Sequence, residues 1–247
     1  MNFFSLFKRK FKFIIKKKIN IDNINLKQKS LDKLFNYFGS DKSFYLGNSK
    51  TLAHGYSKFY TKNLDHLKNK KINILEIGSY AGSSAVAFKK YFKYSKIYCF
   101  DINISNFKYY SKNIKVFGLD IGDEKKTERI IKKKIIQNDT EFFDIIVDDG
   151  SHNLSDMIIS FKYLFKFLKK KGFYIIEDFK FPNYFKYNKN IKHILLDKMF
   201  TQLKNKKLFT SKIIDKKDQR GILKSIKKIK SYKGNLYYSD ICFIKKK

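Results

Sequence analysis

Short apolar runs alternate with helix-like segments from residue 72 onward, and this alternation limits the fold more than any other feature of the chain. Runs rich in Ile, Val, Phe and Tyr predict strands, and apolar residues at three- and four-residue steps predict helices. Strands that alternate with helices favour a mostly parallel sheet covered on both faces. We therefore expect an α/β, Rossmann-like fold. The expected strands are 72–77, 96–100, 114–119, 142–147 and 173–176, and the expected helices are 83–92, 124–137, 154–168 and 191–203.

The end of the chain departs from this alternation. Two strand-like runs, 226–232 and 236–244, flank the dipeptide Gly234-Asn235, which is typical of a hairpin turn. We expect an antiparallel hairpin at one edge of the sheet. A length of 247 residues suits a single domain with short extensions. The expected division is an N-terminal segment, 1–29, and one domain, 30–247, whose lead-in is 30–70.

The N-terminal segment combines aromatic and basic residues. Its apolar residues recur at three- and four-residue steps with lysines between them, so a helix here would have one apolar and one basic face. Such a helix can lie in a membrane interface, with its lysines near anionic headgroups. A poorly ordered tail and a helix packed on the domain are the alternatives. The apolar residues are Phe3, Phe4, Phe7, Phe11, Ile14 and Ile15.

Cysteine usage and hydropathy favour the cytoplasm. The two cysteines, Cys99 and Cys242, lack CxxC or metal-binding spacing, which suits a reducing compartment. No apolar run approaches the roughly 18 residues of a membrane span. With the N-terminal segment, these features predict a cytoplasmic protein that attaches peripherally to the inner face of the membrane.

The formal charge of +33 suggests a nucleic-acid partner, but the kind of basic residue argues against it. Only three of the 55 basic residues are arginine, Arg9, Arg129 and Arg220, although nucleic-acid readers rely on arginine's bidentate fork. Lysine is enriched together with Ile, Asn, Phe and Tyr, as AT-rich codons would produce. We expect compositional drift rather than a nucleic-acid site, and attraction to a polyanion or an anionic membrane stays open.

Carboxylates follow two of the expected strands. Asp148 and Asp149 end the run 142–147, with His152 three residues after Asp149, and Glu177 and Asp178 end the run 173–176. Carboxyl ends of adjacent parallel strands meet at a crevice. Three carboxylates there suit a hard divalent cation, and a histidine beside them can move a proton. Asp148 is expected to point elsewhere, toward a cofactor, because adjacent strand residues alternate faces.

A turn of small residues joins the expected strand 72–77 to the expected helix 83–92. Glycines let a ligand approach the backbone, and free amides at a helix N-terminus attract polar groups. A dinucleotide fingerprint would need glycines at 80 and 83, and a Walker loop would need a Gly-Lys pair; neither is present. Acidic residues at three successive strand ends favour S-adenosylmethionine, since a carboxylate suits its amino and sulfonium groups. The residues of this expected cofactor site are Glu76, Gly78, Tyr80, Gly82 and Ser83, with Asp101 for the ribose hydroxyls and Asp120 for the adenine amino group.

Six motifs carry a family resemblance that spans roughly residues 32–244. The chain resembles class I S-adenosylmethionine-dependent methyltransferases. Within them it resembles the metal-dependent macrocin- and mycinamicin-type sugar O-methyltransferases, a family that includes cephalosporin hydroxylase-like proteins. The pair DDGSH and EDF, spaced around one helix, is its most specific part. The motifs are GSDK at 39–42, HGYSKFY at 54–60, LEIGSYAGSS at 75–84, FDIN at 100–103, DDGSH at 148–152 and IIEDF at 175–179.

The resemblance implies roles for individual residues. Mg²⁺ would be held by Asp149, Glu177 and Asp178, and His152 would be the general base. The segments GSDK and HGY would close over cofactor or substrate, which makes Asp41, His54 and Tyr56 further candidates.

The implied activity is methylation of a sugar hydroxyl on a glycan, glycolipid or glycosylated metabolite. The identity of the acceptor and a homo-oligomeric state stay open. The alternatives are an RNA methyltransferase, which the charge would favour, and a catalytically silent membrane-associated protein of the same fold.

Overall fold

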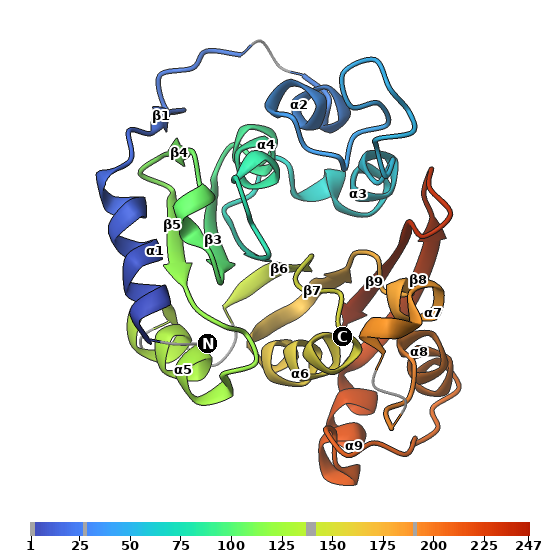
Figure 1. Cartoon of the computed structure of the whole chain (residues 1–247). Helices are drawn as coiled ribbons and strands as arrows, with labels where there is room; N and C mark the ends of the chain where they lie inside the picture. The colour runs from blue at the N-terminus through green and yellow to red at the C-terminus, as the bar shows by residue number, and fades with distance from the viewer. Residues whose placement is uncertain (1–2, 27–28, 137–141, 190–191) are drawn as a thin grey trace. The chain divides into compact units, whose positions relative to one another are not determined.

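The structure is a computed structural model and describes residues 3–26, 29–136, 142–189 and 192–247 (Figure 1). It divides into two compact units. The first comprises Met1–Asp120 with Gly234–Tyr237, and the second comprises Ile121–Lys233 with Tyr238–Lys247. The division into an N-terminal segment, 1–29, and one domain, 30–247, stays a prediction. Parts of the predicted segments 1–29, 124–137 and 191–203 lie outside the described residues.

A parallel sheet with the strand order β5-β3-β2 lies at the centre of the first unit. Strand β2 (Ile72–Ile77) is buried along almost its whole length, as expected for an inner strand of a parallel sheet. It pairs with β3 (Ser95–Asp101), which pairs with β5 (Ile114–Gly118). The strands predicted at 72–77, 96–100 and 114–119 are therefore confirmed. The crossover between β2 and β3 is α4 (Ser83–Tyr91), which was also predicted.

Lead-in helices cover α4. Phe35 and Tyr60 both meet the ring of Phe88 edge-on, at centroid distances of 5.3 and 5.2 Å, so the lead-in shares the core of the first unit. The other elements of this unit are α1 (Phe3–Ile15), β1 (Ile19–Asn20), α2 (Leu31–Phe38), α3 (Ser57–Leu64) with the 3-10 turn η1 (Asp65–Leu67), η2 (Ile104–Asn106) and β4 (Tyr109–Tyr110), which pairs in parallel with β1.

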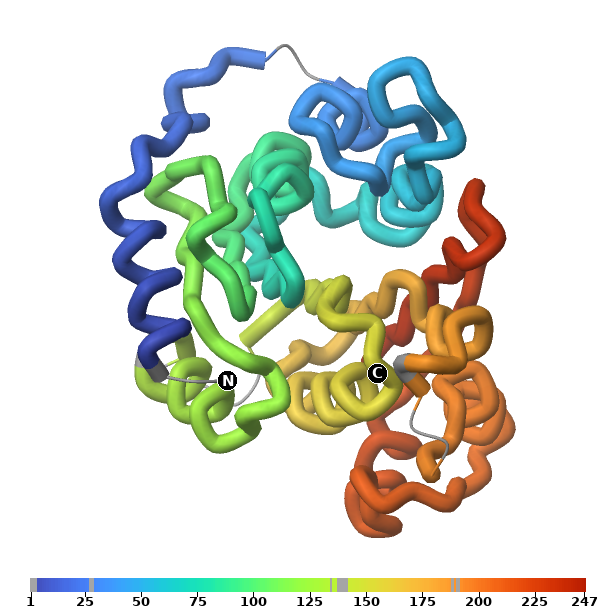
Figure 2. The backbone as a smooth tube through the Cα atoms, in the orientation of Figure 1, coloured from blue at the N-terminus to red at the C-terminus, as the bar shows by residue number. Residues whose placement is uncertain are grey.

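The second unit carries the rest of the predicted pattern (Figure 2). Strand β6 (Phe143–Asp148) runs parallel to β7 (Leu168–Ile176), and β9 (Asp240–Lys246) pairs antiparallel with both β7 and β8 (Ile226–Lys233). The C-terminal hairpin is therefore confirmed. Between β6 and β7 lies α6 (Leu154–Leu164), which buries the apolar face that its periodicity predicts.

Several boundaries differ from the prediction. The prediction of a helix over 154–168 was wrong after Leu164, because the 3-10 turn η4 (Phe165–Phe167) follows α6. Strand β7 begins at Leu168 rather than at the predicted residue 173. Helix 124–137 divides into α5 (Glu124–Ile130) and the π-helix η3 (Ile131–Ile136). The remaining elements are α7 (Phe181–Tyr184), η5 (Lys186–Asn188), α8 (Leu196–Lys204) and α9 (Lys216–Ser225).

Within the described parts of the chain, every helix is too short or too polar to form a membrane span.

Candidate functional site

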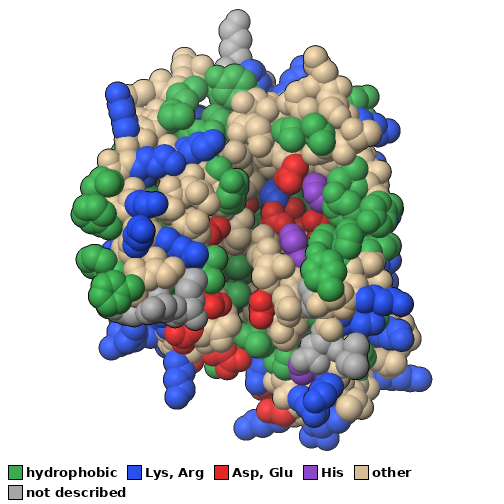
Figure 3. Space-filling model, viewed as in Figure 1, with side chains coloured by type: hydrophobic (Ala, Val, Ile, Leu, Met, Phe, Trp, Pro, Cys, Tyr) green, Lys and Arg blue, Asp and Glu red, His purple; other side chains and the backbone are tan. Residues whose placement is uncertain are grey.

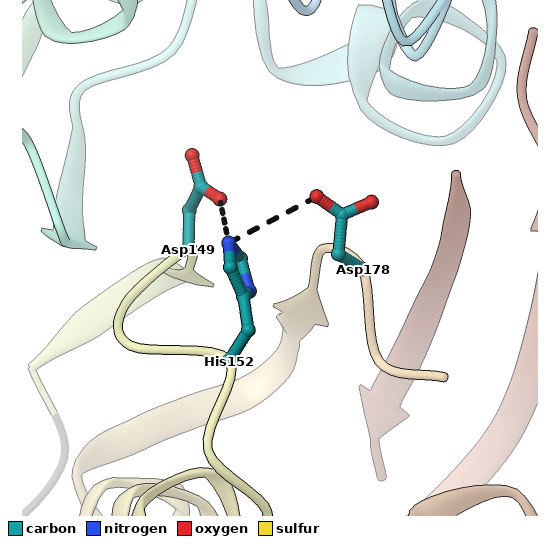
Figure 4. Close-up of side chains that lie close together, drawn as sticks. All are labelled: Asp149, His152 and Asp178. Atoms are coloured by element: carbon teal, nitrogen blue, oxygen red, sulfur yellow. Dashed lines mark ion pairs between the residues drawn. The ribbon is translucent and has the colours of Figure 1, made fainter. Parts of the chain in front are cut away.

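Asp149, His152 and Asp178 form a carboxylate–histidine cluster in the second unit (Figure 4). Asp149 follows β6 and Asp178 follows β7, and His152 points toward both from the loop before α6. Its Nε2 atom lies 3.6 Å from Oδ1 of Asp149 and 3.9 Å from Oδ2 of Asp178. One ligand atom from each residue lies within 4.8 Å of the other two. The ends of two adjacent parallel strands thus bring these side chains together.

Short-range hydrogen bonds hold the loop that carries His152. The hydroxyl of Ser151 donates to Asp156 at 2.6 Å, and it accepts from the backbone N–H of Asn153 at 3.2 Å. Asn153 in turn caps α6 by accepting from the N–H of Ser155. These contacts explain why a Ser, an Asn and an Asp surround the histidine.

Two residues of the cluster occupy the left-handed backbone region, at φ +54° for His152 and +48° for Asp178. This conformation costs a non-glycine residue about 1 kcal/mol or more. The N–H of Phe181 donates to the carbonyl of Asp178 at 2.7 Å, which closes the turn after β7. Strained turns that aim side chains at one point are typical of functional sites.

The donor set of the cluster fits a divalent cation. The Asp178 side chain is only 7% exposed, while those of Asp149 and His152 are 23% and 24% exposed. Two partly buried carboxylates this close repel one another, and a hard cation would relieve that repulsion while accepting their oxygens as ligands. The imidazole offers either a further ligand or a proton acceptor.

Glu177 and Asp148 lie next to the cluster but outside it. Glu177 is buried, and its backbone N–H donates to the carbonyl of Asp148 at 3.0 Å. Among the described residues, the candidate metal group contains Asp149, His152 and Asp178 without Glu177. The assignment of Glu177 as a ligand stays a prediction.

Asp148 points into the packed interior of the second unit. Its Oδ2 accepts from the hydroxyl of Tyr174 at 3.1 Å, and that hydroxyl lies 2.8 Å from the Ser160 hydroxyl. Burial raises the pKa of Asp148 to about 6, although hydrogen bonds from Ser160 and Tyr174 lower it in part. The expected alternation of faces explains why Asp148 and Asp149 diverge. No sequence pattern indicates Ser160 and Tyr174 as partners of Asp148. A cofactor role for Asp148 stays a prediction.

The turn after β2 in the first unit is held by Asp101. Its Oδ2 accepts from the N–H of Tyr80 at 2.7 Å and its Oδ1 from the N–H of Asn103 at 2.6 Å. The turn needs positive φ at Gly78 (+78°), Tyr80 (+41°) and Gly82 (+83°). Asp101 therefore fixes the conformation of this turn. The remaining lone pairs of its carboxylate can still accept hydrogen bonds from hydroxyl groups, as its predicted role toward the ribose requires.

The other predicted cofactor residues differ in exposure. Glu76 is fully buried in β2. Burial raises the pKa of the Cys99 thiol, and the negative charge of the nearby Glu76 carboxylate raises it further. Ser83 begins α4, and Asp120 is half-buried after β5. Tyr80 is largely exposed. Their roles toward a cofactor stay predictions.

The GSDK and HGY segments lie side by side in the first unit. Asp41 Oδ2 is 3.7 Å from His54 Nε2, and the rings of His54 and Tyr56 are 5.2 Å apart. The hairpin-tip residue Asn235 ties this lead-in together: its N–H donates to the carbonyl of His54, and its amide donates to the carbonyls of Phe44 and Ala53. Tyr56 is fully buried and Asp41 is exposed, so Asp41 and His54 have more access to a ligand.

Comparisons with known proteins were made by sequence and by structure. No protein-family model matches the chain. The chain is 31% identical over 145 residues to L-olivosyl-oleandolide 3-O-methyltransferase of Streptomyces antibioticus, a match to 51% of this chain and 33% of that enzyme. It is 28% identical over 144 residues to mycinamicin VI 2''-O-methyltransferase of Micromonospora griseorubida, covering 51% and 31%. These matches thus span about a third of each relative.

A solved structure extends the likeness to most of the chain. The MycE methyltransferase of the mycinamycin biosynthetic pathway, in complex with Mg, SAH and mycinamycin VI, superimposes with a TM-score of 0.64 and 20% identity. The match covers 89% of this chain and 55% of that one. The chain therefore has the Rossmann-like fold of the class I methyltransferases. Over about half of its length the chain is similar in sequence to sugar O-methyltransferases of the mycinamicin and macrocin type.

Proposed function

We propose that this chain is an S-adenosylmethionine- and Mg²⁺-dependent O-methyltransferase that acts on a sugar hydroxyl of a glycan, glycolipid or glycosylated metabolite. The carboxylate–histidine cluster at the ends of β6 and β7 carries the proposal, because it combines ligands for a hard cation with a proton acceptor. The relatives named as sugar O-methyltransferases, and the MycE complex with Mg and SAH, support it.

In this proposal Asp149 and Asp178 hold the Mg²⁺ ion, and Glu177 assists. When bound, the ion lowers the pKa of a sugar hydroxyl and fixes its orientation. His152 accepts the hydroxyl proton at Nε2, the atom that faces both carboxylates. Orientation of the acceptor oxygen in line with the methyl carbon and the sulfur supplies a large part of the rate.

The turn after β2 is the proposed cofactor site. Gly78, Gly82 and Ser83 present backbone close to a ligand and the N-terminus of α4. Asp101 receives the ribose hydroxyls, Asp120 the adenine amino group and Glu76 the positive end of the cofactor. Tyr80 and Asp148 complete the predicted set, with Asp41 and Tyr56 from the lead-in.

Methyl transfer from labelled S-adenosylmethionine to a panel of glycosides tests the proposal. We expect transfer that requires Mg²⁺ and stops with EDTA. His152→Ala should lower the rate by about 10²-fold or more, because general-base catalysis contributes about that much. His66→Ala, at an exposed histidine of η1, is the matched control and should leave the rate unchanged. Transfer that is insensitive to EDTA and to His152→Ala would contradict the proposal.

The RNA methyltransferase alternative rests on the charge of +33. It predicts tight RNA binding that weakens steeply with salt, and RNA methylation that survives Asp178→Asn. The same labelled-cofactor assay with total RNA as acceptor separates the two functions.

The exposed face of α1 supports peripheral attachment to an anionic membrane. Phe4, Phe7 and Phe11 are 79, 62 and 55% exposed, whereas the opposite face packs on the first unit through Phe13, whose ring is 6.5 Å from that of Phe107. Figure 3 shows hydrophobic and basic side chains interspersed along the edge where Figure 1 places α1. An apolar stripe flanked by lysines is typical of helices that lie in a membrane interface.

Vesicle co-sedimentation tests this attachment and the peripheral location that it implies. We expect binding to vesicles that contain phosphatidylglycerol, and weaker binding to pure phosphatidylcholine. Phe7→Glu should abolish binding. Tyr94→Glu, at an aromatic that is 50% exposed and far from α1 in sequence, should not. Equal binding of both variants would contradict a role for α1.

A further inference from the structure

Aromatic rings extend from the carboxylate–histidine cluster along one side. The His152 ring lies 5.4 Å from the ring of Phe181, the first residue of α7. Phe181 stacks on Phe185 at 4.2 Å, and Tyr238 meets both at 6.0 and 5.8 Å. Tyr187 continues the series, 6.2 Å from Phe185. We call Phe181, Phe185, Tyr187 and Tyr238 the aromatic platform.

The platform is only partly buried. Phe181, Phe185 and Tyr238 each keep an intermediate exposure, and Tyr187 is 84% exposed. Rings that serve only the core are buried on all sides, and contiguous exposed aromatic surface is typical of binding sites. These rings therefore offer apolar surface next to the proposed base.

Polar contacts fix the platform in place. The hydroxyl of Tyr184, at the end of α7, donates to Asp240 Oδ2 at 2.8 Å, and Lys233 Nζ donates to the same oxygen at 2.8 Å. Lys180 Nζ lies 3.3 Å from the other oxygen of Asp240. A buried carboxylate on β9 thus anchors both ends of α7, so the rings need little rearrangement to receive a ligand.

A sugar ring has an edge of hydroxyl groups and an apolar face of C–H groups. A sugar with one hydroxyl at Nε2 of His152 would lie beside an imidazole whose ring centroid is 5.4 Å from that of Phe181. We propose that the aromatic platform binds the apolar face of the acceptor sugar while the cluster takes its hydroxyl edge. The proposal rests on the proposed function and adds a specificity-determining surface to it.

The absence of tryptophan from the sequence allows a binding test that needs no catalysis. Tyr187→Trp would introduce a single reporter at the outer end of the platform. The probe is methyl α-L-rhamnopyranoside, and mannitol, which has hydroxyls but no ring face, is the matched control ligand. We expect a saturable change in tryptophan emission with the glycoside and none with mannitol. No change with the glycoside, or the same change with mannitol, overturns the proposal.

A second variant separates stacking from folding. Phe185→Leu in the Tyr187→Trp protein should raise the Kd for the glycoside about two- to tenfold, the range of one aromatic contact. Tyr94→Leu, an exposed aromatic before β3, should leave the Kd unchanged. An unchanged Kd in Phe185→Leu overturns the platform. Glycoside binding without any methyl transfer would retain the platform and contradict the proposed function.

Discussion

Gly82 provides a quantitative test of the turn that leads from β2 into α4. Gly82 has φ +83°, and a Cβ atom built on it would lie 2.6 Å from both Cε2 and Cζ of Phe107. Phe107 is fully buried, so its ring cannot move aside without disturbing the core. We expect Gly82→Ala to lower the free energy of unfolding by about 2–4 kcal/mol. About 1 kcal/mol of this comes from the left-handed conformation and about 1–3 kcal/mol from overpacking.

Two other glycines separate these contributions. Gly39 also has positive φ, +74°, but nothing lies within 4 Å of the position of its Cβ, so Gly39→Ala should cost only the conformational part, about 1 kcal/mol. Gly221, inside α9, has neither constraint, and Gly221→Ala should stabilise the protein by about 0.5–1 kcal/mol.

Urea unfolding followed by circular dichroism measures all three variants. Calorimetry with S-adenosylhomocysteine should also show weaker binding to Gly82→Ala, since a displaced Phe107 moves the turn. If Gly82→Ala and Gly39→Ala cost the same, the close packing of Phe107 against the turn is wrong.

Three further predictions concern buried and charged groups. Asp178→Asn removes one carboxylate of the cluster, so the Kd for Mn²⁺ measured by electron paramagnetic resonance should rise at least tenfold, and an unchanged Kd would exclude Asp178 as a ligand. The pKa of Asp148 is raised from 3.8 to about 6 in the fold, so ionisation of Asp148 destabilises the folded state as the pH rises through that range. Metal-free Asp148→Asn should therefore be more stable than the parent by about 3 kcal/mol at pH 7 and should lose this advantage below pH 4. Unfolding curves at both pH values measure the difference. Burial raises the pKa of Cys99 well above its usual value and that of Cys242 to about 12, so neither thiol should react with iodoacetamide until the chain is unfolded, and rapid labelling of the folded protein would contradict the packing of β3 or β9.

Periodicity was sufficient to predict the central strands, but it failed where polar residues form regular structure. The run Lys169–Lys171 resembles a loop, yet it belongs to β7. Helix α9 was missed because few of its residues are apolar. Its position depends on the buried side chain of Gln219, which accepts from the N–H of Phe209 and donates to the carbonyl of Ile214. Such hydrogen bonds between a buried side chain and the backbone of a preceding loop leave no repeating pattern in a sequence.

The principle that side chains at the carboxyl ends of adjacent parallel strands meet likewise accounts for only part of the candidate site. It brings Asp149, His152 and Asp178 together, because side chains that follow adjacent parallel strands share one edge. It gives no information on which way each side chain points, and the role of the buried Glu177 stays a prediction. The ring of Phe181 beside His152 depends on a four-residue helix, α7, that is too short to show periodicity.

Anomalous diffraction from crystals grown with Mn²⁺ and S-adenosylhomocysteine tests the central claim most directly. The account predicts one strong peak within bonding distance of carboxylate oxygens of Asp149 and Asp178, with Nε2 of His152 beyond bonding distance and directed at the acceptor side. A peak bonded to His152 would make this residue a ligand rather than the base. If no peak appears between the two aspartates, the metal-dependent mechanism is wrong.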